Sequence, residues 1–246
     1  MFTKLLAYEI RSRYRTDVRS FGAFIAVIAV AAGIVAAGLP GISGSTAVLA
    51  YALCALTPVA CAIAALADYW KTLYGQRGYF TMSLPVSGKV IFWAKNTRIA
   101  IECLLARALA VGGIIAVASA AAWSDGISLA EYTAGPRSVV AGMPTSTVVI
   151  MIVVQVLVSL SWLVQGSAVM SIGAEGRFNH MGFGAPIIGF VLLYIVNQVL
   201  STVGTFFLPL SVTTDGHFST EIMWTSYLAT MGTEGHPTVI GIGSYV

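Results

Sequence analysis

Long apolar runs separated by short polar segments dominate the chain. Five of these runs exceed the roughly 18 residues that a helix needs to cross the hydrocarbon layer of a membrane. They cover residues 21–40, 46–67, 99–123, 147–172 and 185–208. The pattern predicts an all-α polytopic membrane protein with five spans. Composition agrees, because 57% of the residues are hydrophobic and only 9% are charged, whereas a soluble domain carries about a quarter charged residues.

Residues 1–19 precede the first run and predict an amphipathic helix on the membrane surface. Leu6, Ile10 and Tyr14 fall on one side of this helix, and the opposite side carries Lys4, Arg11, Arg15 and Arg19. Such a division is typical of a helix that lies in the membrane interface. Arg13 projects toward the apolar side and interrupts the pattern.

The basic residues predict the orientation of the spans. They gather before the first run, between the second and third runs, and between the fourth and fifth: Lys4, Arg11, Arg13, Arg15, Arg19, Lys71, Arg77, Lys89, Lys95, Arg98 and Arg177. Arg137 is the only basic residue in the segment 124–146. By the positive-inside rule, the first three regions are cytoplasmic and residues 124–146 are external. We therefore expect a multi-pass protein of the cytoplasmic membrane with a cytoplasmic N-terminus.

The last 38 residues of the chain, 209–246, contain no Lys or Arg, so a fifth crossing is expected to leave them outside. Residues 239–246 read as the beginning of another apolar run. We expect a sixth span, followed by a short cytoplasmic tail, to be missing from this chain. Residues 1–208 are then the transmembrane domain, and 209–246 an external segment that leads to the missing span.

The polar segment 69–96, between the second and third runs, is unusually rich in aromatic residues. Tyr74, Tyr79, Phe80 and Met82 accompany Arg77 in this segment. Aromatic residues, methionine and arginine are typical of protein docking surfaces. Tyr and Trp are also common in the interface belt of a membrane. The residues alone leave both interpretations open.

The segment resembles the cytoplasmic coupling region of the permease subunits of type-2 ABC exporters. The residues that carry the resemblance are Leu73, Tyr74, Gly75, Gly78, Tyr79, Thr81, Leu84, Pro85, Val86, Ser87 and Lys95. Supporting stretches are Leu5, Leu6, Tyr8 and Glu9, and the region from Ser171 through Gly182 to Gln198. The resemblance covers roughly the first 200 residues. Arg77 departs from it, since such permeases often carry an acidic residue before the Gly-Tyr pair, and so does Gly88, where they often carry a basic one.

The resemblance implies a division of labour with other subunits. The chain is expected to be the membrane-spanning subunit of an exporter of an unidentified substrate, paired with a second copy or a related permease. Docking onto an ATP-binding cassette subunit would involve Gln76, Arg77, Gly78, Tyr79, Phe80, Thr81, Met82, Pro85 and Val86. ATP and magnesium would bind that partner, and no cofactor is expected here, since Gly88-Lys89 lacks the remainder of a phosphate-binding loop. Membrane lipid is a further expected partner, and nucleic acid is not.

Ionisable residues within the spans are candidates for function, because a charge in lipid is costly. Glu102 and Arg107 lie well inside the third run. Arg98 and Glu102 are four residues apart and can pair on one helix face. Glu102 can therefore be a salt-bridged structural residue while Arg107 extends toward the headgroups, or both can line the substrate path.

The fifth run carries a polar stripe with helical spacing, formed by Gln198, Ser201, Thr202 and Thr205, with Asn197 beside it. Such a stripe faces protein or water. It predicts either interhelical hydrogen bonds or the lining of a translocation path. His217, Glu221, Glu234 and His236 lie close in sequence, but they lack a compact ligand motif, and no metal site is expected.

Two other classes of function compete with the exporter. A proton-coupled secondary transporter is typically rich in intramembrane acidic residues or histidines, and the spans contain Glu102 alone. An intramembrane hydrolase needs a nucleophile and base or a metal at membrane depth. The spans contain no histidine, and Asp68 lies at a span end, which disfavours the hydrolase.

Overall fold

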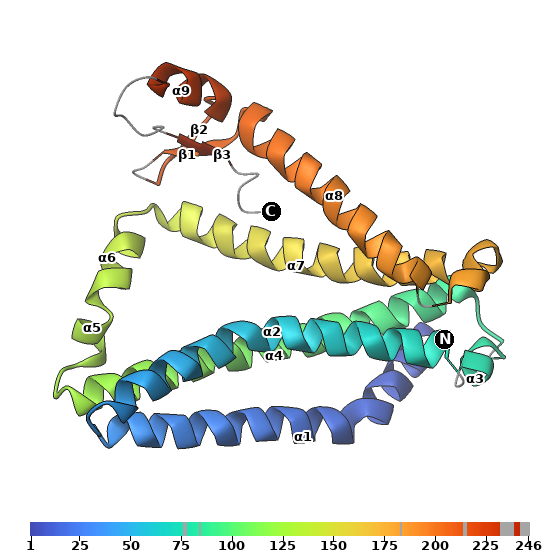
Figure 1. The fold of residues 1–246 in the computed structure, drawn as a ribbon, viewed down its shortest axis with the longest axis horizontal. Coiled ribbons are helices and arrows are strands. Elements are labelled where there is room, and N and C mark those ends of the chain that lie inside the picture. The colour runs from blue at the N-terminus through green and yellow to red at the C-terminus, as the bar shows by residue number, and fades with distance from the viewer. Residues whose placement is uncertain (76–77, 84, 183, 214–215, 232–238, 242–246) are drawn as a thin grey trace. The chain divides into compact units, whose positions relative to one another are not determined.

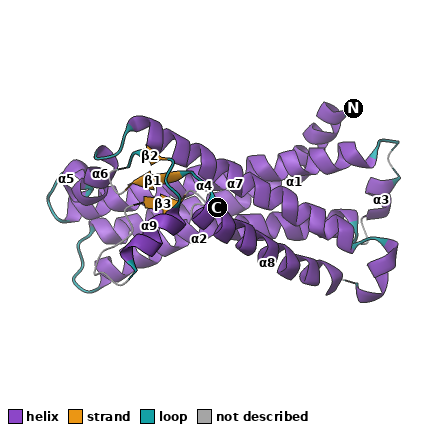
Figure 2. Cartoon of the chain, turned by 90° about the horizontal axis from the view of Figure 1, so that it is seen from above, coloured by secondary structure: helices purple, strands orange, loops and turns teal. Residues whose placement is uncertain are grey.

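The computed structural model of the chain describes residues 1–75, 78–83, 85–182, 184–213, 216–231 and 239–241. Helices account for most of it (Figure 1). They are α1 (Phe2–Ala36), α2 (Ile42–Leu73), α3 (Gly78–Met82), α4 (Gly88–Ser124), α5 (Leu129–Tyr132), α6 (Ala134–Ala141), α7 (Thr145–Gly173), the 3-10 helix η1 (Gly176–Met181), α8 (Gly184–Phe207) and α9 (Met223–Thr230). Three short strands, β1 (Ser211–Thr213), β2 (Phe218–Ser219) and β3 (Val239–Gly241), complete the described part of the chain (Figure 2).

Five helices, α1, α2, α4, α7 and α8, are long and apolar enough to cross a membrane. They coincide with the five predicted runs and confirm the prediction of an all-α polytopic membrane protein. Large apolar side chains are exposed along all five helices, as expected of surfaces that face lipid.

Three of these helices are much longer than a membrane is thick. α1, α2 and α4 contain 35, 32 and 37 residues. At about 1.5 Å per residue they extend about 48–55 Å, against about 30 Å of hydrocarbon. The predicted polar loop 69–96 is therefore largely helical, because α2 continues to Leu73 and α4 begins at Gly88. The predicted surface helix 1–19 is likewise continuous with the first span. Figure 1 shows the first turns of α1 at an angle to the remainder of that helix.

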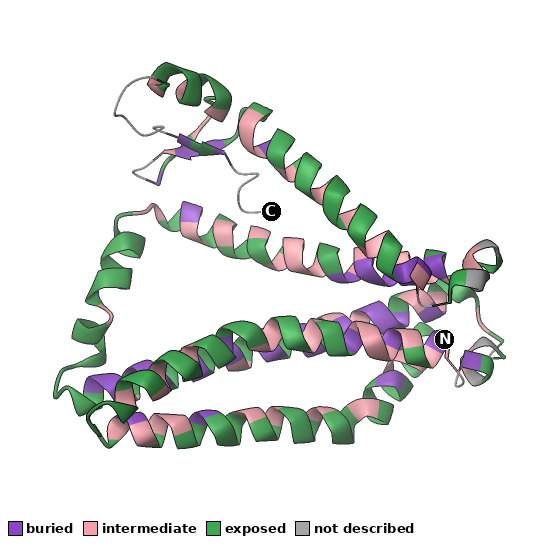
Figure 3. Ribbon diagram, in the orientation of Figure 1, coloured by how far each residue is buried: buried purple, intermediate pink, exposed green. Residues whose placement is uncertain are grey.

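The chain forms two compact units, Met1–Ala134 and Gly135–Val246. In the first unit, α4 packs against both α1 and α2. Most of the buried residues of the first unit lie on α4. Buried residues are purple in Figure 3. One apolar cluster joins the three helices through Ile28, Ala50, Cys54, Ala110 and Val117. Gly113 of α4 lies within this cluster, where a Cβ atom would approach Cys54 Sγ to 2.7 Å.

In the second unit, α7 and α8 cross closely where Gly173 faces Pro186. The strands form an antiparallel sheet in the order β2-β1-β3. The Thr147 hydroxyl of α7 donates a 2.8 Å hydrogen bond to the carbonyl oxygen of Gly216, in the turn between β1 and β2. This buried bond fastens the sheet to the start of α7.

Residues 239–246 were expected to begin another apolar run, but the part of them that the structure describes is not helical; a sixth span missing from this chain stays a prediction. Val239–Gly241 is a strand paired with β1, in which Val239 pairs with Thr213 and Ile240 with Val212. Val239 is buried. Residues 242–246 lie outside the described residues. The apolar character of the strand thus reflects burial in a small sheet rather than contact with lipid.

The packing of α4 is tested by leucine at two adjacent glycines. We expect Gly113→Leu to lower the free energy of unfolding by about 1–3 kcal/mol, because a side chain there overpacks the cluster with Cys54 and Ile28. Gly112→Leu is the matched control, since a Cβ atom at Gly112 would meet nothing within 4 Å. Thermal denaturation in detergent measures both. Equal losses in the two variants would show that α4 does not pack as described.

Candidate functional site

A network of buried and half-buried charges joins α1, α2 and α4 near one end of the first unit. On α1 and on α4 the charged residues share one helix face, because they are spaced three or four residues apart. They are Glu9, Arg13 and Asp17 on α1, Asp68 on α2, and Lys95, Arg98 and Glu102 on α4. These faces meet within the helix bundle, where the charges pair with one another, while Arg13, Asp17 and Asp68 stay partly exposed.

The deepest pair joins α1 to α4. The Lys95 ammonium group lies 2.9 Å from Glu9 Oε1. The residues are 2% and 8% exposed, so both charges have lost most of their water. A charge buried in this way is tolerated when an opposite charge and further hydrogen bonds replace the solvent. Lys95 Nζ supplies one such bond, donating to the Thr72 hydroxyl of α2 at 3.0 Å.

The second part of the network centres on Asp68. One carboxylate oxygen lies 2.8 Å from Arg13 Nη1, and the other lies 3.2 Å from Arg98 Nη2. Arg98 Nη1 also pairs with Glu102 Oε2 at 2.7 Å, which confirms the predicted pairing of these two residues. Arg13 approaches Glu102 Oε1 at 3.8 Å and Asp17 at 3.6 Å. Positive and negative groups therefore alternate across all three helices.

The network connects to the short helix α3 through Thr72. The Thr81 hydroxyl of α3 donates to the Thr72 carbonyl oxygen at 3.1 Å. The Thr72 hydroxyl donates to the Asp68 carbonyl oxygen at 2.8 Å and accepts from Lys95. A continuous path of hydrogen bonds thus leads from α3 through Thr72 and Lys95 to Glu9.

Two glycines allow α3 to fold back against the end of α2. A Cβ atom on Gly75 would lie 2.6 Å from the Lys71 carbonyl oxygen, and one on Gly78 would overlap the Leu73 carbonyl oxygen. The Gly78 amide also donates to the Gly75 carbonyl oxygen at 2.8 Å. Only glycine fits such close backbone approaches without displacing the chain. The turn sets the position of Thr81 relative to Thr72.

The predicted docking residues divide into three groups. Gln76, Arg77 and the side chains of Phe80 and Met82 lie outside the described residues. Gly78 is buried and Thr81 is half-buried, while Pro85 is exposed and Val86 half-buried. Tyr79 is 88% exposed, and no ring contact or hydrogen bond of its side chain is present among the described residues.

The other aromatic residues of segment 69–96 pack mostly against one another. Tyr69 is buried and makes edge contacts with Tyr74 and Phe92, at ring-centroid distances of 6.4 and 6.5 Å. Trp70 lies 5.3 Å from Tyr74. Aromatic contacts of this kind stabilise the junction of α2 and α4. Tyr79 is therefore the described aromatic residue of α3 that remains available to a partner.

Glu102 and Arg107, both predicted from their depth in the third run, have different surroundings. Glu102 belongs to the charge network. Arg107 is half-buried and forms no salt bridge or hydrogen bond with the residues that the structure describes. Of the two interpretations, a salt-bridged Glu102 is the one that the contacts bear out, while a role of either residue in a substrate path stays a prediction.

The polar stripe on α8 is largely satisfied by helices of its own unit. Asn197 Nδ2 donates to Gln165 Oε1 of α7 at 2.8 Å, and Gln165 in turn donates to the Ser161 hydroxyl at 3.1 Å. The hydroxyls of Thr202 and Thr205 donate to the carbonyl oxygens of Gln198 and Ser201 on their own helix. The interhelical alternative thus holds for Asn197. Gln198 and Thr202 are exposed, and their place in a translocation path stays a prediction.

The C-terminal segment 209–246 contains His217, Glu221, Glu234 and His236, which lie close in sequence. No group of three or more His, Cys, Asp or Glu side chains with a metal-binding arrangement occurs among the described residues. Glu234 and His236 lie outside them. His217, which is described, is exposed.

Comparisons with protein-family models, with curated proteins and with solved structures find no match to this chain. Its function is therefore inferred from the residues and contacts described above.

Much of the network was missed from the sequence because its partners are distant. Glu9 and Lys95 are 86 residues apart, and Arg98 and Asp68 are 30 apart. One signal was present: Arg13 interrupts the apolar side of the amphipathic pattern, and Glu9 and Asp17 lie one helical turn before and after it. A charged stripe on the otherwise apolar side of a helix indicates charged partners on a neighbouring helix.

The Glu9–Lys95 pair is tested by removing each charge separately. We expect Lys95→Met to destabilise the chain by about 3–5 kcal/mol, because it leaves the buried Glu9 carboxylate without its cation. The double variant Glu9→Gln/Lys95→Met should recover more than about 1 kcal/mol relative to additivity. Lys89→Met, at an exposed position of the same helix, is the control. Additive losses, measured by denaturation in detergent, would mean that the two side chains do not interact.

Proposed function

We propose that this chain is the membrane-spanning permease subunit of an ATP-driven exporter, located in the cytoplasmic membrane. ATP and magnesium bind a separate ATP-binding cassette subunit, and a second copy or a related permease completes the membrane part. The observation that carries the proposal is α3, which presents an exposed Tyr79 and is hydrogen-bonded through Thr81 to the end of a membrane span. The resemblance of segment 69–96 to type-2 exporter permeases supports the same conclusion.

The contacts around α3 suggest how movement of a partner reaches the spans. A partner that binds Tyr79 and displaces α3 also displaces Thr81 relative to Thr72. Thr72 is bonded to Lys95, and Lys95 holds Glu9 of α1. A displacement of α3 therefore changes contacts on α2, α4 and α1 together, which is the requirement for coupling a docking event to rearrangement of the membrane helices.

The distribution of exposed cations supports a cytoplasmic position for α3. Even when the network cations Arg13, Lys95 and Arg98 are set aside, several basic residues remain exposed before the first span and between the second and third: Lys4, Arg11, Arg15, Arg19, Lys71 and Lys89. Arg137 is exposed in the segment on the other side. The asymmetry favours a cytoplasmic N-terminus by the positive-inside rule.

A proton-coupled secondary transporter is the second candidate, and one observation favours it. Glu9, Asp68 and Glu102 place three carboxylates between helices, where intramembrane proton carriers have theirs. Each of these carboxylates is paired with a basic residue of the same unit, which favours a structural role. Export driven by a proton gradient, without a partner ATPase, would select this second candidate.

The proposed orientation is tested by cysteine labelling in intact cells with a membrane-impermeant maleimide. Lys89→Cys should be labelled only after the cells are opened, whereas Arg137→Cys should be labelled in intact cells, because the basic-residue asymmetry places the two positions on opposite sides. The native Cys54, Cys61 and Cys103 provide the background in the unmodified chain. External labelling at position 89 would invert the topology and remove α3 from the cytoplasm.

The coupling role of α3 is tested with two pairs of variants on the chain purified together with its ATPase. We expect Tyr79→Ala to weaken ATPase binding about tenfold or more, since a buried aromatic anchor contributes about 2 kcal/mol. Tyr79→Phe, which keeps the ring, should retain most of the binding. Thr81→Val should leave binding intact and reduce transport-coupled ATP hydrolysis, because it removes the bond to Thr72, whereas Thr81→Ser keeps that bond.

Full ATPase binding and coupling in both Tyr79→Ala and Thr81→Val would exclude α3 as the coupling element. Failure of the chain to co-purify with any subunit that carries a Gly-x-x-x-x-Gly-Lys motif would contradict the exporter itself.

A further inference from the structure

The short helix α9 follows the last described span and has one apolar side. Met223, Trp224, Tyr227 and Leu228 fall on this side at helical spacing, and α9 contains no charged residue. The opposite side carries hydroxyl groups that are satisfied locally. Thr225, on this opposite side, donates to the Ile222 carbonyl oxygen at 2.6 Å, and Thr230, at the last position of the helix and on the side of Met223, donates to the Tyr227 carbonyl oxygen at 3.0 Å. An uncharged amphipathic helix with Trp and Tyr is typical of the membrane interface.

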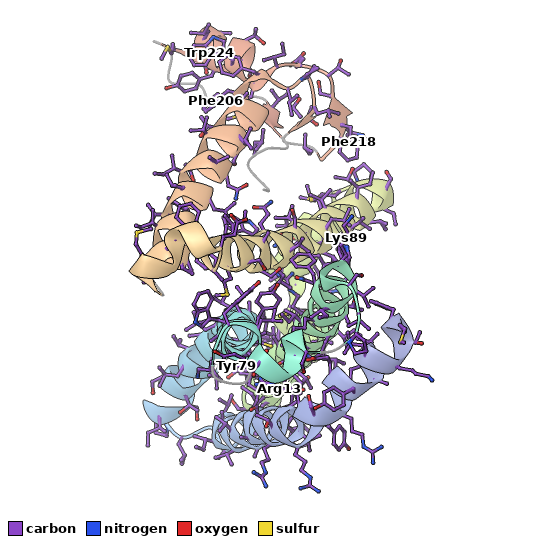
Figure 4. All side chains as sticks on the ribbon, turned by 90° about the vertical axis from the view of Figure 1, so that its right-hand side faces the viewer. Arg13, Tyr79, Lys89, Phe206, Phe218 and Trp224 are labelled. Atoms are coloured by element: carbon purple, nitrogen blue, oxygen red, sulfur yellow. The ribbon has the colours of Figure 1, made fainter. Side chains whose placement is uncertain are left out.

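Aromatic contacts hold α9 against the end of α8. Trp224 lies 6.0 Å from the ring centroid of Phe206 and 5.8 Å from that of Phe207. The ring centroid of Tyr227 lies 6.3 Å from that of Phe206 and 6.2 Å from that of Trp224. The rings of Tyr227 and Trp224 are stacked. Figure 4 shows Phe206 and Trp224 together at this end of the second unit. The Met223 sulfur also accepts a hydrogen bond from the Gly241 amide at 3.4 Å, which fixes the other edge of α9 to β3.

The length of α8 determines the depth at which α9 lies. The helix has 24 residues. At about 1.5 Å per residue it extends about 36 Å, slightly more than the hydrocarbon layer of about 30 Å and less than the roughly 40–45 Å of a bilayer with its headgroups. With α8 centred on the bilayer, Phe206 and Phe207 at its end fall in the headgroup layer. Trp224 and Tyr227, in ring contact with them, lie in the same layer.

Contacts within the unit leave part of the apolar side of α9 uncovered. Trp224 remains 39% exposed and Leu228 48% exposed, and Phe207 and Met231 beside them are also exposed. Aqueous solvent is a poor environment for such a patch, whereas the boundary between headgroups and acyl chains accommodates both the rings and the nearby hydroxyl groups.

We propose that α9 is a membrane-surface helix that rests on the bilayer at the Phe207 end of α8. Trp224, Tyr227 and Leu228 face the lipid, and the side of Thr225 faces water. Lipid is the occupant that the position at a span end, the aromatic composition and the absence of charge favour together. The inference depends on α8 crossing the membrane and is independent of what the protein transports.

The test uses the full chain in phosphatidylcholine vesicles with bromine atoms at defined depths in the acyl chains. The difference in fluorescence between the unmodified chain and Trp224→Phe reports on Trp224 alone, and the substitution keeps an aromatic ring. We expect bromine near the headgroups to quench this contribution at least about twofold more than bromine near the chain ends, as for an interfacial residue. Aqueous iodide should quench it weakly.

The matched control moves the indole to the neighbouring position. In the double variant Trp224→Phe/Thr225→Trp the indole lies on the hydroxyl side of the helix, so iodide should quench it more strongly than the brominated lipid does. Quenching of Trp224 by iodide alone would overturn the proposal. Protection of Trp224 from both quenchers would also overturn it, because the apolar side would then be covered by a second copy or another protein.

A second measurement needs no substitution. A phospholipid with a diazirine group close to its headgroup should crosslink, on illumination, to the peptide that contains Trp224, Tyr227 and Leu228 in the unmodified chain. Mass spectrometry locates the modified residues. Absence of crosslinks in this peptide, with crosslinks present elsewhere at span ends, would contradict a lipid-facing α9.

Discussion

A charged side chain that leaves water must find an opposite charge, and this requirement sets the arrangement of α1, α2 and α4. Their apolar faces alone would permit many rotations and shifts, since one aliphatic surface packs nearly as well as another against its neighbour or against lipid. The polar contacts permit far fewer helix rotations and shifts. They place Asp68 between Arg13 and Arg98, and Lys95 between Glu9 and Thr72. A small rotation of any one helix would leave a buried charge without its counterpart, which costs several kcal/mol.

In the proposed exporter, the same network would connect α3 to the membrane helices. Helices that extend well beyond the membrane can carry a displacement inward if their outer ends are joined firmly, and Thr72 joins them by bonding at once to α3 and α4. The tight turn at Gly75 and Gly78 holds α3 close to the end of α2. Tyr79 is highly exposed, and Thr81 on the same helix is hydrogen-bonded to α2. In the proposed exporter, this combination would suit a surface that a partner subunit moves.

Features with local signals could be predicted from the sequence. The five spans follow from the length of the apolar runs, and the Arg98–Glu102 pair follows from its four-residue spacing. Features that depend on distant partners could not be predicted. Glu9 and Lys95 meet only in the folded bundle, and the strand at Val239–Gly241 needs β1 for its hydrogen bonds. A three-residue apolar stretch has the same composition in a strand as at the start of a span, so periodicity could not separate them.

The distance in sequence between Glu9 and Lys95 has a consequence for biosynthesis. During synthesis α1 and α2 emerge first, carrying Glu9 and Asp68, while Lys95 and Arg98 are still to be made. A hairpin of the first two spans is thus electrostatically incomplete, and it gains its full set of ion pairs only when α4 enters the membrane. The order of translation thereby delays final assembly of the first unit: before α4 is made, Asp68 has, among the described residues, only Arg13 of α1 as a charged partner, and the Glu9 carboxylate lacks its cation.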